Sequence, residues 1–267
     1  MKKIFLQALI TTILFVATLF FLRKVDWMTV FKIEKLTQKT QQKIGDIFWE
    51  TIQQTEKVNT DVYANNCADS IVTKICVANN IDRKLIKVHI VDKDEVNAFA
   101  IPNGHLVVYS GLIKKSDNAD EVAGVIAHEI AHTQLDHLTK NLIKEMGLSA
   151  LLSISAGSAG GEVIKRAIKI LSSTAYDRKL EKEADIKAVD YLLNCNINPE
   201  YFSNFLYKIS DEQPSSLQNL TWISTHPDSK ERAKYIMDYM KGKQRKFTTI
   251  LSTETWVAFQ KSLKEKE

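Results

Sequence analysis

Residues 128–132 read His-Glu-Ile-Ala-His, and these residue types at this spacing are suited to holding a metal ion beside a general base. On an α-helix, side chains four residues apart lie on the same face. His128 and His132 would therefore direct two imidazole nitrogens at one point, which suits a zinc ion. Glu129 would lie next to them, where its carboxylate can hold a zinc-bound water and accept a proton from it. The alternative is a helix that carries two hydrogen-bonded core histidines.

The residues around this motif predict that it lies inside a buried helix. Asn118 is a candidate N-cap, and Glu121 follows it at the spacing of a capping box. Apolar side chains then recur at steps of three and four residues: Val122, Val125, Ile126 and Ile130. Two histidines and a glutamate are costly to bury on such a helix unless they are paired or bound to a metal. The flanks therefore favour the zinc site.

A catalytic zinc ion needs a third protein ligand. One class of zinc protease provides it by continuing the motif with a glycine and a third histidine. This chain has Leu135 and Leu138 at those two places, which excludes that class. The other common solution is a glutamate on a later helix.

Residues 176–190 contain carboxylates at the spacing that such a helix requires. Glu181 and Asp185 are four residues apart, so Glu181 can act as the ligand while Asp185 accepts the outer N–H of a zinc-bound histidine. Glu183 is the rival ligand, but Lys187, four residues beyond it, cannot accept that hydrogen bond. For this segment taken alone, the alternative is a solvated helix with Glu–Lys pairs.

These two segments together resemble the gluzincin metallopeptidases of the CAAX-prenyl-endopeptidase-like family, metallopeptidase family forty-eight. Three further segments are similar to that family: Asn97–Leu112 ahead of the active-site helix, Ala175–Arg178 ahead of the third ligand, and Thr225–Arg232, whose His-Pro pair resembles the BepA- and Oma-like soluble-domain branch. The resemblance covers residues 60–240 in outline. It implies a zincin domain with one zinc ion per chain and a protein or peptide substrate.

His226 is a further candidate for the centre. It precedes Pro227 and a predicted helix over residues 228–240, so it would be fixed at the start of that helix. The resemblance implies that this histidine approaches the zinc and controls or stabilises the reaction, and that Arg232 helps to position the segment. A helix-entry histidine without a metal role is the alternative.

The other three histidines are interpreted as structural or surface residues. His89 lies on a predicted strand and His105 lies in a predicted turn. His137 stands five residues past His132, which is the wrong helical step for joining the other two histidines of the motif.

Two short strands are predicted ahead of the motif helix. Residues 86–91 partly alternate in the manner of a half-buried strand. Residues 97–101 and 106–110 flank a turn signal, Pro-Asn-Gly-His, and would pair as a hairpin. An edge strand beside the zinc would bind an extended peptide through backbone hydrogen bonds. An ordinary core sheet is the other interpretation, and the two are compatible.

The N-terminus predicts a membrane anchor. Residues 4–22 carry no formal charge and are just long enough to span a bilayer. No Ala-x-Ala-like cleavage site follows this run, so we expect an uncleaved anchor that contacts membrane lipid. Lys2-Lys3 and Arg23-Lys24 balance the two ends, and the early position of the span favours a catalytic domain on the extracytoplasmic, periplasmic side of the cell membrane.

The expected domain organisation has four segments. They are an N-terminal membrane anchor over residues 1–26, a helical stalk over 27–59, a zinc metallopeptidase domain over 60–245 and a C-terminal tail over 246–267. Residues 148–161 are rich in small residues and interpreted as a flexible lid or a membrane-facing loop over the cleft, or else as a plain linker.

Composition excludes several classes of protein. The net charge of +4 arises from scattered Lys residues, without a basic cluster or a nucleic-acid motif, so no nucleic-acid partner is expected. Cys67 and Cys76 on a predicted helix would not meet, and Cys195 lies far away in sequence, so neither a disulfide framework nor a Cys-type zinc site is expected.

The sequence therefore predicts a mostly α-helical α+β zincin domain with a small sheet, preceded by one N-terminal transmembrane helix. The expected function is a membrane-anchored zinc metalloendopeptidase that acts on misfolded or membrane-associated proteins in envelope protein quality control. Glu129 would be its general base. The competing function is a non-proteolytic membrane-anchored chaperone or assembly factor that keeps a structural zinc site. The intact Glu129 favours the enzyme, because a structural site needs no general base.

Overall fold

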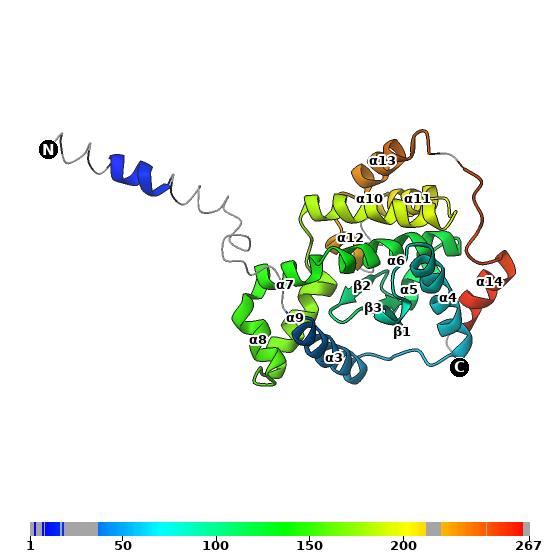
Figure 1. The fold of residues 1–267 in the computed structure, drawn as a ribbon, viewed down its shortest axis with the longest axis horizontal. Helices are drawn as coiled ribbons and strands as arrows, with labels where there is room; N and C mark the ends of the chain where they lie inside the picture. Colours follow the sequence, from blue (N-terminus) through cyan, green and yellow to red (C-terminus); the bar gives the residue numbers. More distant parts are fainter. Residues whose placement is uncertain are drawn as a thin grey trace. The chain divides into compact units, whose positions relative to one another are not determined.

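Helices surround a small sheet in the part of the chain that the computed structural model describes (Figure 1). The described residues are 37–211, 220–243 and 245–263, together with a few N-terminal positions: Lys3, Gln7, residues 9–16 and Thr18. The chain divides into two units, Met1–Thr37 and Gln38–Glu267. Most of the described residues are helical and three strands form one sheet, which confirms the predicted mostly helical α+β class.

The N-terminal unit is described only in part. Residues 9–16 are helical and exposed, and they fall within the predicted apolar span over residues 4–22. Residues 4–6, 8, 17 and 19–22 of that span lie outside the described residues. Residues 23–36 also lie outside them, and these include the first ten positions of the predicted stalk. Within the described residues, no helix combines the length and the apolar character needed to cross a membrane.

The sheet has the strand order β1-β3-β2. Strand β1, Lys87–Val91, runs parallel to β3, His105–Tyr109, while β2, Ala98–Ile101, pairs antiparallel with β3. The β2–β3 pair is the predicted hairpin, and its turn contains Asn103 and Gly104 with positive φ angles of 65° and 69°. Because β3 lies in the middle, β2 is an edge strand of the sheet.

Helix α6, Ala119–Gln134, is the predicted motif helix and lies between the sheet and helices α10 and α11 (Figure 1). The side chain of Asn118 caps it by accepting a hydrogen bond of 3.0 Å from the Glu121 backbone N–H. Glu121 in turn accepts from the backbone N–H of Asp117 at 3.0 Å and pairs with Lys208 at 2.7 Å. The N-terminus of α6 is therefore fixed by side chains on both sides of the cap.

Three C-terminal helices cover the outer face of α6 or pack on its neighbours: α10, Arg178–Asn194, α11, Glu200–Ser210, and α13, Ser229–Met240. The contact between α6 and α11 is close at Gly124. A Cβ atom on this residue would lie 2.5 Å from the Cβ of Phe202. A glycine at this position therefore allows α11 to approach the motif helix.

Helix α3, Gln38–Thr55, occupies part of the segment predicted as a stalk. Ile44, Phe48 and Ile52 are buried, and the helix packs against β2 and against α8 and α9. Helix α8 spans Leu148–Ser155 and α9 spans Gly161–Ser173, so the segment interpreted as a flexible lid or linker is half helical and ends at the first turn of α9.

The remaining elements complete the core around these layers. They are α4 (Val62–Ala78), a 3-10 helix (Arg83–Leu85), α5 (Ser110–Lys115), α7 (His137–Met146), α12 (Thr221–Thr225) and α14 (Thr253–Ser262). Helix α14 lies in the predicted C-terminal tail and packs on α4, with Trp256 and Phe259 buried.

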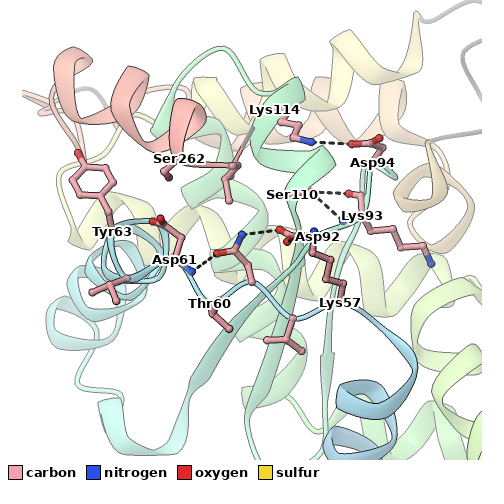
Figure 2. A pocket seen from close by; sticks show the side chains of 14 residues that line it. Lys57, Thr60, Asp61, Tyr63, Asp92, Lys93, Asp94, Ser110, Lys114 and Ser262 are labelled. Carbon is pink, nitrogen blue, oxygen red and sulfur yellow. Dashed lines mark hydrogen bonds and ion pairs between the residues drawn. The ribbon is translucent and has the colours of Figure 1, made fainter. Parts of the chain in front are cut away.

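A hollow of about 560 Å³ opens between the start of α4, the end of β1 and the C-terminal end of α14. Four of its charged side chains form two ion pairs with one another, and all four are labelled in Figure 2. Lys114 lies 2.9 Å from Asp94, and Asp92 accepts a hydrogen bond of 2.7 Å from Asn59 and pairs with Lys57 at 3.6 Å. This hollow includes no residue of the metal-binding motif.

Candidate metal centre

The motif histidines and Glu181 converge at one buried point. His128 and His132 project from α6, and their Nε2 atoms lie 3.0 Å apart. Glu181 projects from the first turn of α10, with Oε1 3.3 Å from the Nε2 of His132 and Oε2 3.6 Å from the Nε2 of His128. All three side chains are at most 2% exposed. The structure therefore brings together the three residues that the sequence predicted as ligands.

The donor atoms and their spacing fit a zinc ion. Two imidazole nitrogens and a carboxylate oxygen are a common ligand set for zinc in catalytic sites. Metal–ligand bonds of about 2.0–2.1 Å in a tetrahedron put neighbouring donor atoms about 3.3 Å apart. The separations of 3.0 to 3.6 Å among these three residues match that value. The donor set and its spacing therefore fit a zinc ion.

His226 joins the same cluster. Its Nδ1 atom lies 2.9 Å from Oε1 of Glu181 and 3.2 Å from Nε2 of His128. One potential ligand atom from each of His128, His132, Glu181 and His226 lies within 4.8 Å of the others. The ring of His226 stacks on Trp222, and its backbone N–H donates to the Trp222 carbonyl at 2.9 Å. The His-Pro segment thus carries a fourth potential donor, a nitrogen, into the centre.

Glu129 lies on the other side of His226. Its Oε1 atom is 3.2 Å from Nε2 of His226, and its Oε2 atom accepts a hydrogen bond of 3.2 Å from the backbone N–H of Ala100. Burial by itself raises the pKa of this carboxyl, but His226 and the two motif histidines lower it below the usual value. Glu129 is therefore ionised, as a general base must be before it accepts a proton.

The carboxylates of Glu181 and Glu129 determine the protonation of His226. Burial opposes its charged form, but Glu181 and Glu129 raise the pKa of His226 to about 9.

Asp185 orients His128. Its Oδ1 atom lies 2.8 Å from Nδ1 of His128, which leaves the Nε2 atom of that ring directed at the other ligands. Arg232 binds the carboxylate of Asp185 at both oxygens, at 2.7 and 2.8 Å, and Tyr235 donates a further hydrogen bond to it. Burial opposes the ionised form, but Arg232 and His128 hold the pKa of Asp185 at about 2.

Arg232 has a larger part than the sequence indicated. Its Nη1 atom lies 2.7 Å from Oε2 of Glu181 and donates a hydrogen bond of 3.1 Å to the backbone carbonyl of His226. The guanidinium is 2% exposed and also lies over the ring of Trp222. One buried cation therefore links the ligand carboxylate, the orienting carboxylate and the His-Pro segment.

His137, interpreted from the sequence as structural or surface, is not part of the four-residue cluster. It is fully buried, and its Nδ1 atom lies 3.1 Å from Nδ1 of His132, a contact that the helical-step argument did not anticipate. The contact arises because α6 ends before this residue: Asp136 has a φ angle of 57°, and His137 begins α7. Burial lowers the pKa of His137 to about 3, so its ring is neutral.

Tyr176 was also missed as a member of the site. Its buried ring lies 4.2 Å from that of His132 and stacks on that of His226 at 5.7 Å between centroids. Its backbone N–H donates to the carbonyl of Thr225. The only sequence signal was its place just before the predicted third-ligand helix.

The remaining predicted site candidates lie elsewhere. Glu183, the rival ligand, is 44% exposed at its side chain and is not part of the four-residue cluster. His89 and His105 contact each other at 2.9 Å, and Trp49 of α3 stacks on both rings. His105 begins strand β3 and does not lie in the turn where it was expected.

Comparison with known proteins gives a consistent result. The model of peptidase family M48 matches residues 65–239. The chain is 31% identical to the metalloprotease LoiP of Escherichia coli over 172 residues, which are 61% of this chain and 66% of that protein.

Two other groups of proteins are also similar. The chain is 26% identical to the beta-barrel assembly-enhancing protease of Yersinia pestis, covering 69% of this chain and 40% of that protein. It is 24% identical to the mitochondrial metalloendopeptidase OMA1 of Schizosaccharomyces pombe, covering 73% and 58% respectively. The chain thus spans about two fifths of the length of the beta-barrel assembly-enhancing protease that it matches.

Proposed function

Because the chain belongs to peptidase family M48, we propose that it is a zinc-dependent metalloendopeptidase that hydrolyses peptide bonds in proteins. The observation that carries this proposal is the position of Glu129. Its ionised carboxylate lies beside a centre of two histidines and a glutamate, and a backbone N–H from β2 orients it. A zinc site with a purely structural role needs no such base.

Each residue of the centre would have a separate role in hydrolysis. His128, His132 and Glu181 would hold the zinc ion, which would supply Lewis-acid chemistry by polarising the substrate carbonyl and lowering the pKa of a water. Glu129 would accept a proton from the attacking water and return it to the leaving amine. Asp185 keeps the Nε2 atom of His128 directed at the ion by accepting the proton on Nδ1.

Strand β2 is the proposed binding site for the substrate backbone. It is an edge strand of the sheet, and the N–H of Ala100 on it already reaches Glu129. An extended peptide paired with β2 would lie alongside the general base. Helix α9 packs on β2, and the side chain of Asn97 donates to the carbonyl of Ser172 in α9. Substrate binding would therefore require α9 to move.

We further propose that His226 restrains the resting enzyme. Its Nδ1 atom lies among the ligand atoms, and once the ring has given up its second proton it can occupy the fourth position on the ion and displace the nucleophilic water. The centre is fully buried, with Glu129 and His226 each 1% exposed, so substrate must displace the His-Pro segment before it reaches the ion. Alternatively, His226 donates to the oxyanion that develops in the transition state.

The proposed location rests on the N-terminal sequence, and the proposed biological role is supported by the relatives. Residues 4–22 would anchor the chain in the cell membrane, with the catalytic unit on the periplasmic face. Relatives named for enhancing β-barrel assembly support a role in envelope protein quality control. Misfolded or membrane-associated proteins are the proposed substrates.

A second candidate function is a non-proteolytic chaperone or assembly factor with a structural zinc site. The place of His226 in one cluster with the three ligands favours it, because four protein ligands are typical of structural zinc. The two functions differ in what they require of Glu129, which is dispensable only in the second.

Cleavage of casein by the purified full-length chain distinguishes these functions. Wild type and His226→Ala should both be tested, so that a closed resting state does not hide the activity. Glu129→Gln keeps the shape of the side chain and removes the base, so cleavage should fall by a factor on the order of 10² or more while zinc content stays unchanged. Glu162→Gln, which changes an exposed carboxylate on α9, is the matched control. Absence of cleavage in both wild type and His226→Ala would favour the chaperone.

Protease added to spheroplasts tests the proposed location. The catalytic unit should be digested while carbonate extraction leaves the chain in the membrane fraction. A mature N-terminus beyond residue 22, or protection of the catalytic unit from protease, would contradict this part of the proposal.

A further inference from the structure

The two motif histidines differ in what contacts their outer nitrogen atoms. Nδ1 of His128 lies 2.8 Å from the carboxylate of Asp185. Nδ1 of His132 lies instead 3.1 Å from another ring nitrogen, Nδ1 of His137. The far side of that second ring, Nε2 of His137, lies 3.3 Å from Oε2 of Glu183.

The ring nitrogen that carries the proton in each histidine follows from which nitrogen faces the metal site. A neutral histidine that binds a metal through Nε2 carries its proton on Nδ1. His132 directs its Nε2 atom at the ligand cluster, so its Nδ1 is the donor. Nδ1 of His137 must then be the acceptor, which puts the proton of this neutral ring on Nε2.

That proton points toward Glu183. Nε2 of His137 is buried and, among the described residues, makes no hydrogen bond of good geometry, so the carboxylate 3.3 Å away is the acceptor within reach. The side chain of Glu183 is 44% exposed, and its other oxygen lies 3.9 Å from Lys179. The outer N–H of His132 thus has an acceptor in His137, and the N–H of His137 faces the carboxylate of Glu183.

We propose that His137 and Glu183 are positioning residues for the zinc ligand His132, forming a relay of ligand, histidine and carboxylate that takes the place of the direct carboxylate at His128. The relay fixes the Nδ1–H tautomer of His132 and holds its Nε2 atom toward the ion. Glu183, which sequence spacing presented as a rival ligand, acts two groups away from the metal. The proposal rests on the zinc ligation proposed above, and it does not depend on proteolysis.

Zinc affinity of the purified full-length chain, measured by competition with a chelator, tests the relay. His137→Leu removes the acceptor and should weaken zinc binding by about 10- to 100-fold, the usual effect of losing such a partner. His137→Asn puts an amide oxygen at the place of Nδ1, so it should retain affinity within a few-fold of wild type. A circular dichroism spectrum confirms that each variant is folded.

The contribution of Glu183 is separated by a double-mutant cycle. Glu183→Gln should weaken zinc binding several-fold in wild type and have no effect in His137→Asn, where the amide cannot pass the interaction on. Lys179→Gln removes the neighbouring i,i+4 ion pair and should leave zinc affinity unchanged. Nitrogen NMR of the zinc-bound chain should find the proton of His132 on Nδ1 and that of His137 on Nε2.

Two results would overturn the relay. Equal loss of zinc in folded His137→Leu and His137→Asn would mean that His137 only fills space, and unchanged affinity in His137→Leu would mean that His132 needs no partner. Glu181→Ala serves as the reference for the ligand assignment itself. If Glu181→Ala also retained full zinc affinity, the proposed zinc ligation would fail and not the relay alone.

Discussion

Replacement of the buried Arg232 by Met should destabilise the fold more than the same replacement of an exposed arginine. The guanidinium is 2% exposed and pairs with Glu181 and with both oxygens of Asp185. Methionine fills a similar length without charge. Two buried carboxylates would then lose their cation, and the backbone carbonyl of His226 would lose its donor.

The expected size of the effect follows from the burial of this group. Removing one partner of a buried ion pair costs about 3–5 kcal/mol, because the remaining charge stays out of water. For a unit the size of Gln38–Glu267, each kcal/mol shifts Tm by about 2–4 °C. Arg232→Met should therefore lower Tm by roughly 6–20 °C.

Thermal unfolding followed by circular dichroism, with a chelator present in every sample, measures this shift. Arg178→Met is the matched control: Arg178 also binds an aspartate, Asp228, at 2.7 Å, but its side chain is 80% exposed. An exposed pair is worth at most about 1 kcal/mol, so the control should shift Tm by no more than about 4 °C. Equal shifts in the two variants would refute the reasoning that burial makes Arg232 important.

Three further predictions concern the ligands and the remaining histidines. Glu181→Ala should lose most of its zinc in metal analysis while Glu183→Ala retains at least half, and the reverse order would exchange their roles. His226→Ala should raise basal casein cleavage if the ring restrains the enzyme, whereas a fall would assign it to transition-state stabilisation and no change to neither role. Burial lowers the pKa of His89 to about 3 and that of His105 to about 4, so both rings take up protons on unfolding below about pH 6.5. Stability in urea should therefore fall between pH 6.5 and 4, and the double variant His89→Gln/His105→Gln should show a smaller fall; an identical pH dependence would contradict this account.

Local periodicity was sufficient to predict the motif helix and its two histidines. His128 and His132 are four residues apart on one continuous helix, so their convergence needs no knowledge of the rest of the fold. The same argument placed Glu181 and Asp185 on one face of α10. The β2–β3 hairpin followed from its turn residues, because hairpin pairing is also local.

Contacts that depend on chain reversal were beyond the reach of periodicity. His137 reaches His132 because the chain turns at Asp136, and no spacing rule for one helix describes a residue on the next. The parallel pairing of β1 with β3 joins strands separated by β2 and cannot be read from alternation alone. Likewise, the packing of α3 on the catalytic unit depends on which surface its apolar face meets.

If the His-Pro segment moves as proposed, the arrangement around Arg232 would keep the rest of the centre together. The Nε and Nη2 atoms hold Asp185, while Nη1 contacts both Glu181 and the carbonyl of His226. Movement of the His-Pro segment would cost Arg232 only the last of these contacts, while the ring of His226 would also leave Glu181 and Glu129. A hydrogen bond to a charged group contributes about 1.5–3 kcal/mol, so the Arg232 contact by itself would limit the open form to roughly 1–10% of molecules, and the contacts of the ring would lower that fraction further. Differential binding of a peptide to the open form can offset that amount, and the ligand and orienting carboxylates keep their cation throughout.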